Sequence, residues 1–164
     1  MDKQWFSDRV REQETAMYAL SMSYMKQEAD ALDCMQQSIL KAYESLGTLR
    51  DPEKFRSWLF GILVNCCRDE LRRRQRTRTE EDLPDRAVPE APVSEETRLV
   101  LWNAVRTLPE PYRIELMLFY YEDVPTDEIA EILALKPATV RKHLERGREL
   151  LRLALEKEGF QNDG

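Results

Sequence analysis

Apolar residues recur at three- and four-residue intervals along most of this chain, which is the spacing of helices with one buried face. Alternation of apolar and polar residues, the pattern of a half-buried strand, forms no run of useful length. We therefore predict an all-α protein. The predicted helices span residues 10–28, 29–46, 53–76, 95–107, 110–121, 126–134 and 137–155.

Residues 78–94 interrupt this pattern. The stretch around them, TRTEEDLPDRAVPEAPVSEE, holds three of the eight prolines and is rich in acidic residues. Such a composition cannot bury a core and is typical of a flexible, extended linker. The sequence thus predicts two small helical domains, residues 1–77 and 95–164, joined by a flexible acidic linker at 78–94.

The net charge of -6 hides an uneven distribution of charge. Residues 54–78 carry eight basic and two acidic side chains, a local charge of +6, and residues 136–152 carry six basic and two acidic side chains, a local charge of +4. Between them, residues 79–97 carry seven acidic and one basic side chain, a local charge of -6. Because phosphate binding depends on the local field, the two basic blocks keep nucleic acid among the possible partners.

The composition argues against several other classes of protein. The amino terminus is charged, and the longest apolar run, residues 58–64, is too short to span a bilayer, so we expect a cytoplasmic protein. Cys34, Cys66 and Cys67 form no CxxC pair and fit a reducing compartment as packing residues. The chain has one histidine and no recognisable nucleophile–base set. We therefore expect no catalytic residue, no metal, no cofactor and no small-molecule substrate.

Residues 127–144 have the form of a helix-turn-helix motif. A short helix places Ile129 and Leu133 on its inner face, and after a tight turn a second helix does the same with Val140 and Leu144. The outer side chains of the second helix suit contacts in the major groove of DNA. The predicted contacts are Thr139, Arg141, Lys142, His143 and Arg146. A charged helix face that meets only solvent is the alternative, and for His143 the two interpretations are equally compatible with the sequence.

The helix predicted at 53–76 carries a second basic surface. Asn65, Arg68, Arg72 and Arg76 fall on one narrow stripe, separate from the apolar face of the helix. An arginine stripe that begins with an amide suits contact with a nucleic-acid backbone. Arginines also favour the end of a helix through its dipole, which is the alternative explanation. Trp58, at the start of the stripe, is better explained as a core residue.

Residues 30–43 mix an apolar face with polar side chains and have no basic excess. This helix is either ordinary core and surface or a protein-docking helix, and its residues alone do not separate the two.

Taken together, these segments resemble the extracytoplasmic-function (ECF) class of bacterial RNA polymerase sigma factors. The pattern D-A-x-D-x-x-Q-x-x-x-L-K-A-Y at 30–43 resembles their region 2.2, and F-R-S-W-L-F-G-I-L-V-N-x-x-R-D-E-L-R-R at 55–73 resembles regions 2.3 and 2.4. The motifs at 108–113, 128–133 and 139–152 resemble region 4. The match covers nearly the whole chain in the right order. It departs from the family at Gln37, usually acidic, at Gly147, usually Ala, and at Ala134, usually Gly.

The resemblance implies that the chain binds core RNA polymerase and directs promoter recognition, DNA melting and transcription initiation. Asp33, Gln36 and Leu40 would dock on the polymerase. The residues of the 53–76 helix, Asn65, Arg68, Arg72 and Arg76, would contact the downstream, minus-ten promoter element. The second helix of the helix-turn-helix would read the upstream, minus-thirty-five element as duplex DNA. A restraining anti-sigma factor is a further partner that the family implies.

Two other functions are weighed against this one. A one-component helix-turn-helix regulator would bind a palindromic operator without polymerase. A protein-interaction module would use its basic helices against an acidic partner and would show no preference among DNA sequences. The second basic helix argues against both, because neither function requires it.

Overall fold

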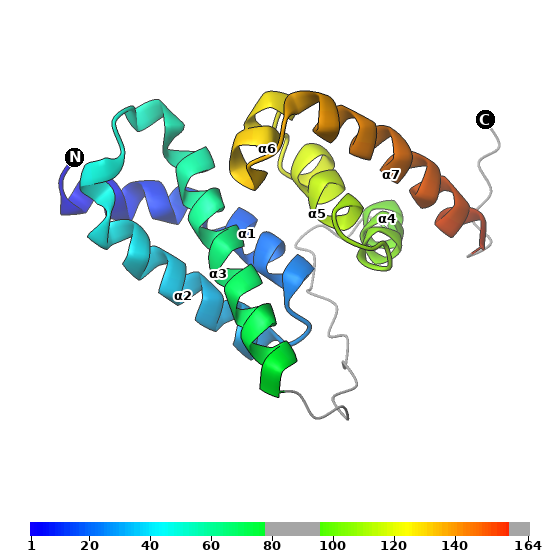
Figure 1. Ribbon diagram of the computed structural model, residues 1–164, viewed down its shortest axis with the longest axis horizontal. Coiled ribbons are helices and arrows are strands. Elements are labelled where there is room, and N and C mark those ends of the chain that lie inside the picture. Colours follow the sequence, from blue (N-terminus) through cyan, green and yellow to red (C-terminus); the bar gives the residue numbers. More distant parts are fainter. Residues whose placement is uncertain (78–95, 158–164) are drawn as a thin grey trace. The chain divides into compact units, whose positions relative to one another are not determined.

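The computed structural model describes residues 1–77 and 96–157, and every regular element within these ranges is helical (Figure 1). The chain divides into two compact units, the first containing α1–α3 and the second containing α4, α5, most of α6 and α7. The all-α fold with two helical units agrees with the prediction. The predicted acidic linker, 78–94, lies outside the described residues.

Three helices that all contact one another form the first unit. Its elements are α1 (Lys3–Tyr24), α2 (Glu28–Glu44), the 3-10 turns η1 (Leu46–Thr48) and η2 (Pro52–Lys54), and α3 (Phe55–Thr77). Apolar side chains from all three helices meet in the core, among them the fully buried Met17, Ala31 and Leu63. Burying one such Met or Leu side chain contributes about 1.5–3 kcal/mol.

The first helix begins at Lys3, earlier than the predicted residue 10. The Asp2 carboxylate accepts a hydrogen bond of 2.8 Å from the Trp5 N–H and so caps the helix. Phe6 and Val10 are buried on this extension, and the Phe6 ring packs on Phe55 with centroids 5.9 Å apart. The exposed polar residues around Phe6 hid the helical period in the sequence.

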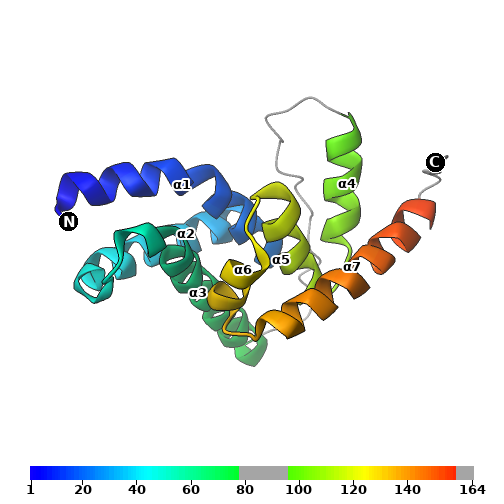
Figure 2. The ribbon, with the colours of Figure 1, turned by 90° about the horizontal axis from the view of Figure 1, so that it is seen from above.

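The second unit contains α4 (Glu96–Arg106), α5 (Tyr112–Leu116), the π-helical turn η3 (Met117–Tyr121), α6 (Thr126–Leu133) and α7 (Pro137–Lys157). Figure 2 shows α6 passing through a tight turn into the long α7. The core of this unit includes Trp102, Ile114, Leu116, Val140 and Leu144. The predicted helix-turn-helix is therefore present as α6, turn and α7.

The turn between α6 and α7 requires a left-handed residue. Ala134 has a φ of 57°, and the next N–H, that of Leu135, donates to the Ala130 carbonyl at 2.9 Å. A left-handed conformation costs an alanine about 1 kcal/mol relative to glycine. The close approach of α7 to α5 is made by Gly147, where an added Cβ would lie 3.2 Å from Leu116 Cδ1.

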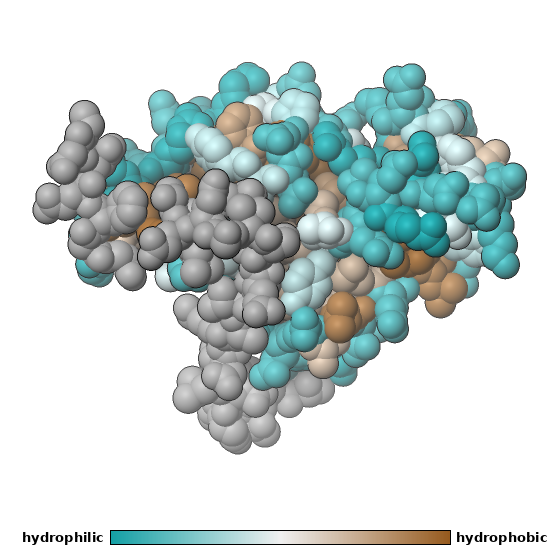
Figure 3. Space-filling view, turned by 180° about the vertical axis from the view of Figure 1, so that it is seen from behind, coloured by the Kyte–Doolittle hydropathy of each residue, from teal (hydrophilic) through white to brown (hydrophobic). Residues whose placement is uncertain are grey.

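Across the described residues, no helix combines the length and apolar character needed to cross a membrane. On the face drawn in Figure 3, hydrophilic residues cover most of the described surface and a few apolar residues reach it.

Candidate nucleic-acid interface

The carboxy-terminal helix α7 presents a cationic outer face. Its inner face is defined by the buried Val140, Leu144 and Gly147. Arg141 and Lys142 are exposed, and neither forms an ion pair with another described residue. Their charges are therefore available to a ligand.

The other predicted upstream residues differ in their surroundings. Arg146 is exposed, but its guanidinium donates to Glu149 at 3.0 Å, so contact with DNA would exchange this partner for a phosphate or a base. Thr139 lies in the first turn of α7 and is half-buried.

His143 lies at the edge of the inner face of α7, and its ring turns toward α5 rather than standing with the exposed outer residues. Its Nδ1 lies 2.7 Å from the Glu115 Oε2 atom, and its ring packs edge-on against Tyr112 with centroids 5.8 Å apart. The Glu115 side chain is fully buried, whereas that of His143 is 26% exposed. The physical reason is that a buried carboxylate in α5 needs a polar partner, and His143 supplies it from the edge of the inner face.

An open groove of about 520 Å³ runs beside the outer face of α7. Its lining residues are Phe119, Thr126, Ala138, Arg141, Lys142, Leu144, Glu145 and Arg148. Arg148 is placed there by a long hydrogen bond of 3.4 Å to the Tyr120 hydroxyl. Glu145 also lines this groove, although the sequence did not single it out, because in the local net charge it only reduces the positive sum.

Helix α3 carries the second predicted surface. Asn65, Arg72 and Arg76 are exposed and Arg68 is half-buried, and their spacing places all four along one side of the helix. Arg72 forms an ion pair with Asp69 one turn earlier. The structure thus brings together the four residues that were predicted to act together.

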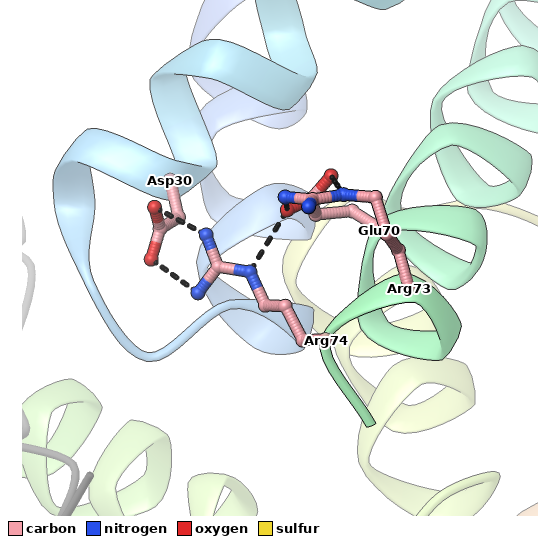
Figure 4. Close-up of polar contacts among 4 residues, drawn as sticks. All are labelled: Asp30, Glu70, Arg73 and Arg74. Atoms are coloured by element: carbon pink, nitrogen blue, oxygen red, sulfur yellow. Dashed lines mark hydrogen bonds and ion pairs between the residues drawn. The ribbon is translucent and has the colours of Figure 1, made fainter. Parts of the chain in front are cut away.

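Arg73 and Arg74 lie between those residues in the sequence and form ion pairs within the first unit (Figure 4). The guanidinium of Arg74 makes two contacts with the Asp30 carboxylate, at 2.8 and 2.6 Å, and a third with Glu70 at 2.9 Å. Hydrogen bonds from Arg73 and Arg74 lower the pKa of Glu70, and the hydrogen bonds to Asp30 and Glu70 raise the pKa of Arg74. The pair with Asp30 ties the end of α3 to the start of α2, so the arginine run offers a ligand less charge than the sequence indicates.

Helix α2 presents a mixed apolar and polar surface. The predicted docking residues Asp33, Gln36 and Leu40 are all exposed, and Leu40 is 59% exposed. Tyr43, 45% exposed, lies one turn beyond them. Exposed large apolar side chains next to polar ones are typical of a protein-binding surface.

Behind this surface, Cys34, Cys66 and Cys67 are buried free thiols. Burial raises the pKa of the Cys66 thiol, and the hydrogen bond with Cys34 raises that of Cys67. Within the described ranges, no group of three or more His, Cys, Asp or Glu side chains is arranged to hold a metal ion.

Comparison with known families decides what these surfaces belong to. Residues 10–77 match the family model of sigma-70 region 2, and residues 98–151 match that of sigma-70 region 4. The chain belongs to the sigma-70 family. It is an ECF sigma factor, and it directs transcription initiation.

Two relatives of this sigma factor come from Bacillus subtilis (strain 168). The RNA polymerase sigma factor SigV is 36% identical over 141 residues, covering 86% of this chain and 85% of SigV. The ECF RNA polymerase sigma factor SigW is 28% identical over 169 residues, covering 94% of this chain and 90% of SigW. The family excludes the alternative of a one-component regulator.

Solved structures show the same fold. The sigma factor RpoE from Bartonella quintana, in complex with the anti-sigma factor NepR, superposes with a TM-score of 0.81 at 20% identity over 92% of this chain and 96% of that chain. CnrH in complex with the cytosolic domain of CnrY superposes with a TM-score of 0.69 at 24% identity, over 95% and 90%. In this sigma factor α1–α3 carry the region 2 match, and α4–α7 carry the region 4 match.

Proposed function

We propose that this sigma factor holds a promoter at two places while bound to core RNA polymerase. The α7 surface of Arg141, Lys142 and Arg146 contacts the upstream element as duplex. The α3 stripe of Asn65, Arg68, Arg72 and Arg76 contacts the downstream element and the strand that is exposed when DNA opens. The observation that carries this proposal is that two exposed cationic surfaces lie on separate compact units, each matching a sigma-70 region.

Neither surface carries enough cations to hold a promoter alone. The groove beside α7 is lined by three cations, and the α3 stripe contains three arginines. Each phosphate contact contributes a salt-dependent term, and few contacts give weak binding at physiological salt. Two surfaces held on one polymerase act at high effective concentration, which makes the second contact nearly intramolecular. The polymerase supplies the chemistry, and the sigma factor supplies no catalytic group.

The exposed α2 surface of Asp33, Gln36 and Leu40 is the proposed polymerase-docking site. The same apolar character suits a restraining anti-sigma factor, and the RpoE structure named above is a complex with such a factor. This sigma factor would then work in the cytoplasm, where the polymerase is. Leu40→Asp should weaken binding to core polymerase in a competition assay, because it places a charge on an apolar contact.

Promoter-specific transcription with core polymerase tests the two-site proposal. Arg141→Ala should reduce promoter binding about tenfold, since one lost base or phosphate contact costs about 1–3 kcal/mol. Asn65→Ala should leave closed-complex binding unchanged and reduce opening. The matched control is Arg152→Ala, which removes an exposed arginine of α7 that pairs with Glu156 at 2.7 Å.

A promoter that is already unpaired around the start site separates the two roles. On this template Asn65→Ala should recover transcription, because the energy of opening has been supplied, whereas Arg141→Ala should not. Equal loss of duplex binding in both variants would contradict the division between the two surfaces. Absence of any promoter-specific transcript with the wild-type chain would refute the proposed function.

A further inference from the structure

The outer face of the recognition helix α7 carries an acidic residue, Glu145, beside Lys142. Val140, Leu144 and Gly147 point into the second unit, and at 100° per residue the opposite direction is occupied by Lys142, Glu145 and their neighbours. Glu145 is exposed and lies within the groove-lining set described above. A helix inserted into the major groove by this face carries the Glu145 carboxylate toward the base edges.

Glu145 has three cationic neighbours at helical spacing and pairs with none of them. Arg141, Lys142 and Arg148 lie four residues before it, three before it and three after it, which are the separations at which helix ion pairs form. Among the described residues, no ion pair or hydrogen bond involves its carboxylate. The two other acids of α7 that carry a described side chain are paired, Glu149 with Arg146 and Glu156 with Arg152.

An unpaired carboxylate weakens DNA binding unless it accepts a hydrogen bond from a donor group of a base. Phosphate oxygens repel it, as do the major-groove acceptors O6 and N7 of guanine and O4 of thymine. The donors in the major groove are the amino groups of cytosine and adenine, and Glu or Asp side chains characteristically accept from the N4 amino group of cytosine. The adjacent cations can hold the flanking phosphates or guanines while Glu145 reads its own base.

We infer that Glu145 is a specificity-determining residue, which accepts a hydrogen bond from the N4 amino group of a cytosine in the upstream promoter element. This inference rests on the proposed function, because it assumes that the outer face of α7 enters the major groove. It also predicts which bases are disfavoured: guanine or thymine at this position would place an acceptor oxygen or nitrogen next to the carboxylate, and the two would repel each other.

Transcription from a promoter library with a randomised upstream element tests the inference. The full chain is combined with bacterial core RNA polymerase, and the templates that give transcripts are sequenced. The wild type should enrich cytosine at one position. Glu145→Ala should lose about tenfold discrimination at that position alone, since a good base contact discriminates by roughly 5- to 150-fold.

Glu145→Gln gives a second, positive readout, because glutamine characteristically pairs with N6 and N7 of adenine. The preferred base at the same position should change from cytosine to adenine. Glu156→Ala is the matched control, as it removes an exposed, paired acid further along α7 and should keep every preference of the wild type.

Three results would overturn the inference. The first is an unchanged preference at every position in Glu145→Ala. The second is a uniform gain on all templates, which would mark Glu145 as a solvated acid that merely repels phosphate. The third is a wild-type preference for adenine at the affected position, which would contradict the choice of cytosine. If the wild type enriches no upstream sequence at all, the proposed function fails as well, and this result differs from the other three.

Discussion

Replacing His143 by alanine should destabilise the second unit of this sigma factor and spare the first. The substitution removes the 2.7 Å contact with Glu115, whose side chain is fully buried, and the edge-on packing of the ring against Tyr112. A hydrogen bond between two side chains contributes about 0.5–1.5 kcal/mol, and leaving a buried partner without it costs about 1–3 kcal/mol. Because the His143 side chain is 26% exposed, water can reach its side of the pair, and we expect a loss of about 2 kcal/mol.

The expected shift in melting temperature follows from this loss of stability and from the size of the unit. A domain of 60–100 residues loses about 4–8 °C of melting temperature per kcal/mol, so the second unit should melt roughly 8–16 °C lower. Trp102 is buried in this unit and reports its unfolding in the full chain once Trp5 and Trp58 have been replaced by Phe. Circular dichroism of the same samples follows both units together.

Two further variants make the test specific. His143→Asn places an amide donor near the position of Nδ1 and should recover part of the loss. Lys142→Ala removes an exposed neighbour on the outer face of α7 and should change the stability by less than about 0.5 kcal/mol. If His143→Ala cost no more than Lys142→Ala, the pair with Glu115 would not stabilise the unit, and our account of why His143 turns inward would be wrong.

Three other outcomes follow from particular side chains. Arg74→Met removes the two-point contact with Asp30 and should cost about 1 kcal/mol in urea unfolding, less at high salt, because the Arg74 side chain is 43% exposed. Burial and the hydrogen bond to Glu28 raise the pKa of Tyr18 to about 12. Stability should therefore fall between about pH 10 and 12, where the unfolded chain releases this proton first, and Tyr18→Phe should remove that part of the slope. Ala134→Gly should raise the melting temperature of the second unit by relieving a positive φ, a gain of about 1 kcal/mol.

The sequence predicted the elements well because each long helix has a regular apolar period. It placed α2, α3, α6 and α7 within about two residues of their observed bounds. It missed the start of α1, where Trp5, Phe6 and Val10 stand among polar residues and the cap is a single Asp2.

The orientation of individual site residues was harder to predict, because it depends on partners distant in the sequence. His143 sits at the edge of the inner face of its helix, and only Glu115, on another helix, decides which way its ring turns. The arginine run was read as free charge, yet Arg74 is held by Asp30, 44 residues earlier. Periodicity assigns a residue to a face, whereas a buried polar group selects which side chain at the edge of that face turns inward.

The reactivity of the three buried thiols reports how often the helices of the first unit separate. All cysteines of the chain lie on α2 and α3, directly behind the proposed docking surface, so a thiol reagent can react only when these helices separate. The labelling rate therefore measures the opening of the first unit without any engineered probe. Measured free and in complex with polymerase, it gives the free energy by which docking closes that helical pair.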